Sequence, residues 1–162
     1  MSGTVVWITG LPASGKTTLA ERVWARLGIP SVLLDSDAIR DVLGEGGYDP
    51  AQRDVFYRRL ARLAALLAAQ GLVVLVAATS NLRRHRDTAR SLAPRYLEVW
   101  VRTPLEEAER RDPKGLYARA RRGDAPQLPG VGAPYEPPPS PDVVADGGLD
   151  EAAAREIIRL VA

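Results

Sequence analysis

The segment from Gly10 to Thr17 constrains the fold more than any other part of the chain, because its sequence GLPASGKT matches the phosphate-binding pattern G-x-x-x-x-G-K-[ST]. The apolar, β-branched run from Thr4 to Thr9 precedes it and predicts a buried strand. After it, Leu19, Val23 and Leu27 recur every four residues, which predicts one face of a helix. A strand, this loop and a helix in succession are the context in which the pattern holds nucleotide phosphates; an ordinary glycine-rich turn is the alternative.

The residue types of this loop each suit phosphate binding. Gly10 and Gly15 allow backbone N–H groups to converge on phosphate oxygens, and the helix N-terminus adds the positive end of its dipole. Lys16 can reach the β- and γ-phosphates, and the Thr17 hydroxyl can ligate Mg²⁺. We therefore expect a nucleoside triphosphate site whose ATP-binding residues are Gly10, Leu11, Pro12, Ala13, Ser14, Gly15, Lys16 and Thr17.

Short apolar runs and helical patterns alternate along the rest of the chain. Further strands are predicted at Ser31 to Leu34, Leu72 to Ala78, Tyr96 to Val101 and Val143 to Ala145. Helices are predicted over Lys16 to Leu27, from the Asp49 cap to Gln70, onward from a capping box at Thr103 to Glu106, and over Glu151 to Val161. Because strands alternate with helices, we expect a parallel sheet covered by helices on both faces.

Length and composition narrow the possible functions. A chain of 162 residues predicts one domain, 1–162. The sequence has no cysteine, which excludes disulfides, thiolate metal sites and a cysteine nucleophile, and its single histidine, His85, argues against a histidine-based triad. The 22 basic residues stand against 20 acids, a net charge of +2 that is too balanced for a nucleic-acid partner. The longest apolar run, Leu72 to Ala78, is too short to span a membrane, and no leader precedes the first strand, so we expect a soluble cytoplasmic protein.

Two carboxylates, Asp35 and Asp37, follow the second predicted strand. Strand alternation would place both on one face, with Ser36 pointing away. At the carboxyl edge of the sheet they would face the phosphates, where one could organise the water around Mg²⁺ and the other could accept a hydroxyl proton. The alternative is that Asp37 caps the following helix, because Asp is a favoured cap residue, and the two roles are compatible for the pair.

The regular alternation breaks between Gly123 and Pro141, a stretch that contains seven prolines. A loop this long inside a compact domain is usually functional or disordered. We expect it to form a lid over the site, and a proline-stiffened strap lying on the surface is the alternative.

Together these segments resemble the adenylylsulfate kinases, enzymes of sulfate assimilation, over nearly the whole chain. Gly10 to Thr18 resembles their phosphate loop, Asp35-Ser-Asp-Ala-Ile-Arg40 resembles their Asp-Gly-Asp-x-x-Arg segment, and Arg83-x-x-Arg86-Asp87 follows the third strand as in the family. The most selective part is Arg111-Asp-Pro-Lys-Gly-Leu-Tyr117, followed by Pro134-Tyr-Glu136. The resemblance implies an α/β, three-layer P-loop NTPase fold with a parallel five-stranded sheet, helices on both faces and a proline-rich lid over about 112–141.

The resemblance also implies a reaction, in which the γ-phosphoryl of ATP passes to the ribose 3′-hydroxyl of adenylyl sulfate with Mg²⁺ as cofactor. Asp37 matches the family's base and Asp35 the partner near the metal, with Lys16 in the catalytic set and Thr17 as a metal ligand. Ser80 matches a serine described in some members as a phosphorylated intermediate; because phosphoryl transfer needs in-line positioning and no covalent relay, we expect Ser80 to be a substrate-lining hydroxyl.

The remaining implied contacts concern the two nucleotides. Arg111 matches an arginine that lies against the ATP adenine, and Thr18 belongs to the phosphate loop. The implied residues for the acceptor, adenylyl sulfate, are Arg40, Tyr48, Arg53, Phe56, Ser80, Lys114 and Leu128. The family also suggests a homodimer, and no nucleic-acid or membrane partner.

Several positions depart from the family pattern, and most of them are positions implied to bind the acceptor. Ser36 stands where the family has glycine, and Phe56 replaces an acceptor-binding asparagine. Of the two aromatic residues that clamp the acceptor adenine, one aligns with Tyr48 and the other with Leu128. Ala78-Thr-Ser-Asn81 replaces a Phe-Ile-Ser-Pro segment. Two alternatives stay open: a related kinase that phosphorylates another small-molecule hydroxyl, and a non-catalytic nucleotide-binding module.

Overall fold

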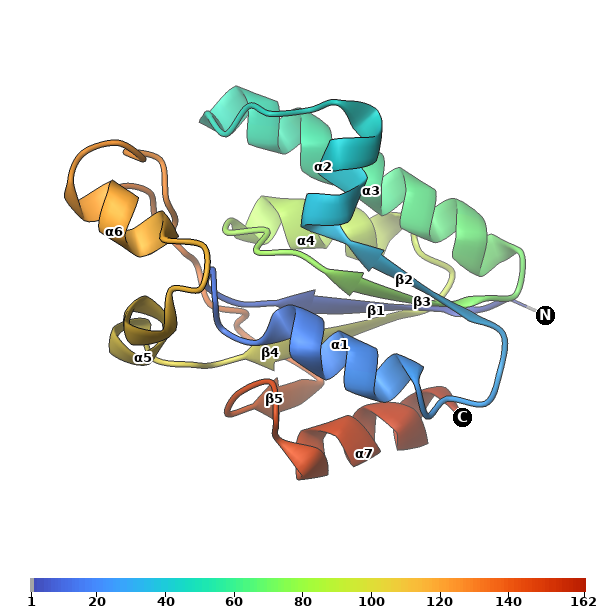
Figure 1. The fold of residues 1–162 in the computed structure, drawn as a ribbon. Helices are drawn as coiled ribbons and strands as arrows, with labels where there is room; N and C mark the ends of the chain where they lie inside the picture. Colours follow the sequence, from blue (N-terminus) through green and yellow to red (C-terminus); the bar gives the residue numbers. More distant parts are fainter. Residues whose placement is uncertain (1) are drawn as a thin grey trace.

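The computed structural model describes residues 2–162 and contains one five-stranded sheet with parallel strand pairing throughout. The strands are β1 (Thr4–Thr9), β2 (Ser31–Asp35), β3 (Val73–Ala77), β4 (Tyr96–Val101) and β5 (Val143–Ala145), in the spatial order β2-β3-β1-β4-β5 (Figure 1). Each predicted strand has a counterpart within one residue at either end. The predicted fold class, a parallel five-stranded α/β sheet, is confirmed.

Helices cover both faces of this sheet (Figure 1). α1 (Lys16–Trp24) and α7 (Glu151–Val161) pack on one face, where their apolar residues share a core cluster with the strands. α3 (Pro50–Ala69) and α4 (Arg83–Leu92) pack on the other face in a second cluster, beside the short α2 (Ser36–Leu43). α5 (Leu105–Arg111) and α6 (Leu116–Arg121) lie beyond the carboxyl ends of the strands.

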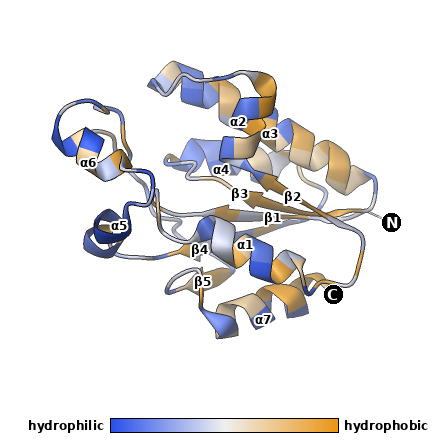
Figure 2. Ribbon diagram, in the orientation of Figure 1, coloured by the Kyte–Doolittle hydropathy of each residue, from blue (hydrophilic) through white to orange (hydrophobic). Residues whose placement is uncertain are grey.

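The central strands are buried on both faces, which explains their uninterrupted apolar sequences. In β1, Val6 and Ile8 belong to the cluster under α1 and α7, whereas Val5 and Trp7 belong to the cluster under α3. Figure 2 shows the strands as hydrophobic and α5 as hydrophilic. Of the helices in residues 2–162, none combines the length and the apolar character needed to cross a membrane.

Two helix ends differ from the sequence prediction. α1 ends at Trp24 rather than at Leu27, although Leu27 still packs into the core. The capping box predicted at Thr103 is wrong: α5 begins without a side-chain cap, and the Thr103 hydroxyl donates to the carbonyl oxygen of Ser14 over 2.6 Å. The phosphate loop thus takes the hydroxyl that local sequence assigns to the helix.

The two carboxylates after β2 also lie differently from the prediction. β2 ends at Asp35 and α2 begins at Ser36, so strand alternation does not extend to Asp37. Asp35, not Asp37, is the cap of α2, because its Oδ1 accepts from the backbone N–H of Asp37 (2.9 Å) and Ala38 (3.4 Å). Ser36 does not point away but lines the same cavity as both acids.

The segment between α5 and β5 has two parts. The first part, which contains Lys114, Tyr117 and Leu128, packs around Tyr117, whose hydroxyl donates to the Pro12 carbonyl oxygen over 2.7 Å. Its small apolar cluster consists of Ala108, Tyr117, Ala120 and Leu128. The second part is tied to the β3–α4 loop: the Asn81 side-chain amide donates to the Pro134 carbonyl oxygen (2.9 Å), and the Glu136 N–H donates to the Asn81 carbonyl oxygen (2.7 Å). This anchored part has the character of a surface strap.

Candidate active site

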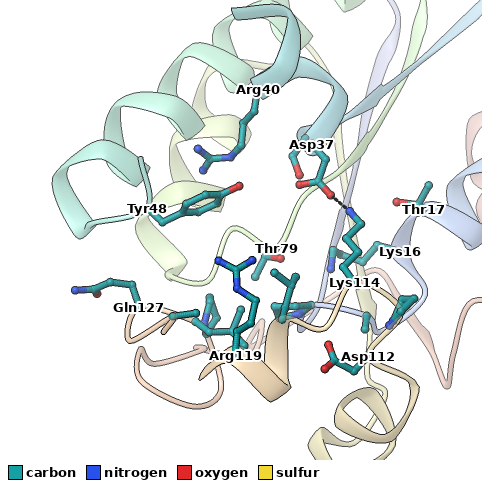
Figure 3. Close-up of a pocket in the computed structure, with 18 of the residues that line it drawn as sticks. Lys16, Thr17, Asp37, Arg40, Tyr48, Thr79, Asp112, Lys114, Arg119 and Gln127 are labelled. Atoms are coloured by element: carbon teal, nitrogen blue, oxygen red, sulfur yellow. Dashed lines mark hydrogen bonds and ion pairs between the residues drawn. The ribbon is translucent and has the colours of Figure 1, made fainter. Parts of the chain in front are cut away.

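A cavity of about 700 Å³ lies at the carboxyl edge of the sheet (Figure 3). Its walls come from the phosphate loop, from α2 and the start of α3, and from the segment between α5 and β5. Basic residues from all three walls line it, namely Lys16, Arg40, Arg53, Lys114 and Arg119. A cavity of this size with several cationic groups suits a polyanionic small molecule.

The phosphate loop has two positions that accept only glycine without rearrangement. Gly15 has a φ of 103°, and a Cβ there would lie 2.6 Å from the backbone nitrogen of Gly148. A Cβ at Gly10 would lie 2.7 Å from the carbonyl oxygen of Val101. Because α1 begins directly after Gly15, its first N–H groups and its positive dipole end face the loop, as anion binding requires. The predicted ATP-binding residues that line the cavity are Pro12, Ala13, Lys16, Thr17 and Thr18; Gly10, Leu11, Ser14 and Gly15 do not line it.

Lys16 is held over the loop, where its Nζ donates to the Leu11 carbonyl oxygen over 2.7 Å. Burial lowers the pKa of Lys16 to about 8, although the nearby Asp37 and Asp35 carboxylates oppose the shift. A phosphate placed on the loop would add negative charge beside Lys16 and so favour the charged form of its ammonium group.

Thr17 and Asp35 are joined at the base of the cavity. The Thr17 hydroxyl donates to Asp35 Oδ2 over 2.5 Å, while Asp35 Oδ1 is fixed by the N-terminus of α2. Residues 2–162 contain no cluster of three acidic, histidine or cysteine side chains that could hold a metal alone. Mg²⁺ needs no such cluster, because it is commonly held by one or two protein oxygens together with substrate phosphates and water. The hydroxyl and carboxylate oxygens of Thr17 and Asp35 therefore fit Mg²⁺.

Asp37 and Lys114 face each other across the cavity. Asp37 lies in the first turn of α2, and its carboxylate forms an ion pair with the Lys114 ammonium group, which comes from the segment after α5 (Figure 3). The side chain of Asp37 is 60% exposed, so a bound molecule can reach it. The hydrogen bond to Asp37 raises the pKa of Lys114 above its usual value.

The side of the cavity formed by α2 and α3 carries the predicted acceptor residues. Arg40, Tyr48 and Arg53 line it, and Figure 3 shows Arg40 and Tyr48 on one side of the cavity with Arg119 and Gln127 on the other. Burial lowers the pKa of Arg53 below its usual value. Lys114 and Leu128, from the segment after α5, also line the cavity as predicted.

Outside the phosphate loop, three further predicted residues do not line the cavity, namely Ser80, Phe56 and Arg111. Ser80 is fully buried, and its hydroxyl accepts from Trp7 Nε1 (2.9 Å) and lies within hydrogen-bond distance of the Ala78 carbonyl oxygen (3.1 Å), so the expected substrate-lining hydroxyl is not found there. Phe56 is fully buried behind Arg40. The Arg111 guanidinium pairs with Glu107 (2.6 Å) on its own helix.

The cavity residues that were not predicted from the sequence include Tyr57, Thr79, Asp112, Arg119 and Gln127. Thr79 follows β3 closely, so the tendency of ligands to bind beyond the carboxyl ends of parallel strands could have found it. It takes the place expected of its neighbour Ser80. Arg119 and Gln127 come from the segment between α5 and β5, whose path no periodic pattern in the sequence predicts.

Comparison with known proteins agrees with this geometry. Residues 2–146 match the family model described as adenylylsulphate kinase. The adenylyl-sulfate kinase of Chloroflexus aurantiacus is 47% identical over 146 residues, which are 88% of this chain and 78% of that protein. The probable adenylyl-sulfate kinase of Halalkalibacterium halodurans is 41% identical over 163 residues, 97% of this chain and 80% of that protein.

Among solved structures, the APS kinase CysC of Mycobacterium tuberculosis in complex with AMPPNP and APS is similar, with a TM-score of 0.90 and 41% identity. The alignment covers 98% of this chain and 97% of that one. The family model matches most of the chain, the identity to these relatives is high, and the phosphate loop lies between a strand and a helix. The chain therefore belongs to the adenylylsulphate kinase family.

Proposed function

We propose that this protein transfers the γ-phosphoryl group of ATP to the ribose 3′-hydroxyl of adenylyl sulfate. The observation that carries the proposal is that one cavity brings the phosphate loop, an exposed carboxylate and several basic side chains together. Phosphoryl transfer needs positioning and charge neutralisation, and these groups supply both. In this proposal residues 1–162 form one catalytic domain, which works in the cytoplasm as a homodimer.

The phosphate loop is the ATP side of this proposal. Backbone N–H groups at the start of α1 bind the phosphates, and Lys16 neutralises the charge that grows on the oxygens of the transferred group. Thr17 and Asp35 would hold Mg²⁺, which supplies further neutralisation of phosphate charge when bound. Arg111, as the family resemblance implies, packs against the adenine outside the cavity.

The acceptor side uses the basic and acidic groups opposite the loop. Arg40, Arg53 and Lys114 bind the anionic groups of adenylyl sulfate, and Tyr48 offers an aromatic face to its base. Asp37 accepts the proton of the attacking hydroxyl. Its ion pair with Lys114 must open first, so that a carboxylate oxygen is free to take the proton. An incoming acceptor anion competes with Asp37 for Lys114 and so releases the base.

The segment between α5 and β5 acts as the lid in this proposal. Lys114 and Leu128 both belong to its first part and both line the cavity, so movement of this part would change access to the acceptor. The strap around Pro134 and Glu136 stays fixed to the β3–α4 loop and serves as the anchor.

The direct test is acceptor-dependent release of ADP with a panel of alcohols. Adenylyl sulfate should elicit ADP release at saturating Mg-ATP, whereas adenosine, sugars and polyols should not. Phe56, which replaces an acceptor-binding asparagine, favours one second candidate, a kinase for another hydroxyl. If a different alcohol elicits turnover and adenylyl sulfate does not, this second candidate is correct.

A variant of Asp37 tests the assignment of the base. Asp37→Asn keeps the shape of the side chain but cannot take a proton. General-base assistance usually contributes about 10²- to 10⁴-fold, so kcat should fall by that order while the KM for ATP stays within about twofold. A collapse of ATP affinity with intact chemistry would assign Asp37 to the metal instead.

A further inference from the structure

The guanidinium of Arg40 lies between two aromatic rings. Its Cζ is 3.9 Å from the centroid of the Phe56 ring and 4.3 Å from the centroid of the Tyr48 ring. Phe56 is fully buried, whereas Tyr48 is 48% exposed and lines the cavity. The stack therefore has one ring in the core and one ring at the cavity, with the arginine between them. Figure 3 shows its outer half, Arg40 and Tyr48.

Hydrogen bonds within the protein satisfy the Arg40 guanidinium only in part. Arg40 is 6% exposed, and its Nη1 donates to the Gly47 carbonyl oxygen over 3.0 Å. Its Nη2 is buried and has no hydrogen-bond partner within residues 2–162. A buried charged donor without a partner is costly, and because Arg40 lines the cavity, an acceptor anion placed there would compensate the charge of its guanidinium.

Phe56 cannot contact such a ligand, since none of its surface is exposed. It can act on the ligand only through the side chain that lies between them, and that side chain is Arg40. Cation–π attraction is strongest where both groups are shielded from water, as they are at this inner face of the stack.

We propose that Phe56 is a positioning residue that holds the Arg40 guanidinium at the wall of the cavity, where its charge can bind an anionic group of the acceptor. This inference rests on the proposed function for the identity of the acceptor. At the position of Phe56 the family pattern has an asparagine that makes a polar contact with the acceptor. In this chain Phe56 would act through preorganisation instead, because an arginine already fixed by two rings loses less conformational freedom on binding. Tyr48 then presents its outer face to the acceptor.

The test is a double-mutant cycle that combines Phe56→Leu with Arg40→Gln. Phe56→Leu keeps an apolar side chain in the core but removes the ring face. Alone, it should raise the KM for adenylyl sulfate by about 3- to 10-fold and leave the KM for ATP within about twofold. In the Arg40→Gln background it should have no further effect on the KM for adenylyl sulfate, because the group through which it acts is gone.

A matched control separates positioning from general loosening of the core. Leu60 is buried on the same helix, one turn after Phe56, and does not line the cavity. Leu60→Val should lower the melting temperature as Phe56→Leu does, with the KM for adenylyl sulfate unchanged. An equal rise of that KM in Leu60→Val, or additive effects in the cycle, would overturn the inference.

A spectroscopic measurement decides the inference even if adenylyl sulfate is not the acceptor. The ¹⁵N-arginine side-chain signals of Arg40 should show ring-current shifts and slow rotation that diminish in Phe56→Leu but not in Leu60→Val. Unchanged Arg40 signals in Phe56→Leu would refute the positioning role. Absence of turnover with adenylyl sulfate in the unmodified protein would instead refute the proposed function.

Discussion

Lys16 is the single residue on which the proposed phosphate chemistry depends most. It is the only lysine of the phosphate loop, and in the ligand-free arrangement its ammonium group donates to a backbone carbonyl of that loop. Burial lowers its pKa to about 8, so the protein holds this cation in an environment that does not favour charge. Phosphate oxygens would remove this disadvantage, which couples the charge of Lys16 to nucleotide binding.

Replacement of Lys16 tests its part in both binding and chemistry. Lys16→Ala removes a charge-assisted contact, typically worth about 1.5–3 kcal/mol, so the Kd for ATP should rise by roughly 10- to 150-fold. Turnover should fall further, because charge grows on the transferred group during the reaction. Titration calorimetry gives the affinity and ADP release gives the rate. Near-normal turnover of Lys16→Ala would exclude the proposed role of the loop.

The lowered pKa of Lys16 also predicts a pH dependence of ATP binding. Without nucleotide, Lys16 loses its proton as the pH rises through about 8, and bound phosphate raises its pKa again. ATP binding at pH 9 should therefore take up a proton that binding at pH 7 does not, and affinity should fall as the pH rises above about 8. Calorimetry in buffers of different ionisation enthalpy measures this uptake. Lys16→Arg is the control, because its side chain stays charged and should show no uptake between pH 7 and 9.

At the scale of elements, α2 connects the proposed metal position to the proposed acceptor position. Its cap Asp35 accepts the Thr17 hydroxyl through one oxygen and the first N–H groups of α2 through the other. Its first turn carries Asp37 and its last turn carries Arg40. One short helix thus fixes the distance between the group that would hold Mg²⁺ and the groups that would hold the acceptor.

Two substitutions can separate the two roles of Asp35, the capping of α2 and the proposed binding of Mg²⁺. Asparagine caps a helix about as well as aspartate, so the free energy of unfolding of Asp35→Asn should stay within a few tenths of a kcal/mol of that of the unmodified protein. The free energy of unfolding of Asp35→Ala should be lower by about 0.5–2 kcal/mol. Both should need more Mg²⁺ for half-maximal activity, because both lack the carboxylate. Urea unfolding and a Mg²⁺ titration of ADP release measure the two effects. A normal Mg²⁺ requirement in Asp35→Asn would show that Asp35 only caps α2.

The five strands and the helices α1, α3, α5 and α7 were predicted from the sequence because their patterns are local, whereas no range was predicted for α2, α4 or α6. Buried strands such as β3 are continuous apolar runs, and the start of α3 carries a proline after the Asp49 cap. The Thr103 cap prediction failed because a long-range partner, the Ser14 carbonyl, takes the hydroxyl. The Ser80 prediction placed the right segment at the site but the wrong side chain: β3 ends before it, and Thr79 lines the cavity instead. Only the three-dimensional structure reveals such partners.

At the scale of the whole molecule, the cavity exists because two distant parts of the chain meet. The sheet side supplies the phosphate loop, α2 and α3, while the segment between α5 and β5 supplies the opposite wall. The Lys114–Asp37 ion pair and the hydrogen bond from Tyr117 to Pro12 join the two parts. The shape of the cavity therefore depends on how the segment between α5 and β5 rests on the sheet, which no single segment determines.

Leu128 offers a test of this dependence, because it belongs both to the apolar cluster of the lid and to the lining of the cavity. Leu128→Phe places a ring where the family resemblance implies an aromatic clamp residue, and the cavity gives the ring room on one side. An aromatic pair is worth about 0.5–1.5 kcal/mol beyond burial, so the KM for adenylyl sulfate should fall by roughly 2- to 13-fold, with the KM for ATP unchanged. Leu105 packs against the same cluster without lining the cavity, so Leu105→Phe is the matched control and should leave both KM values unchanged. If Leu128→Phe keeps its melting temperature but does not bind adenylyl sulfate more tightly, the base of the acceptor does not lie against Leu128.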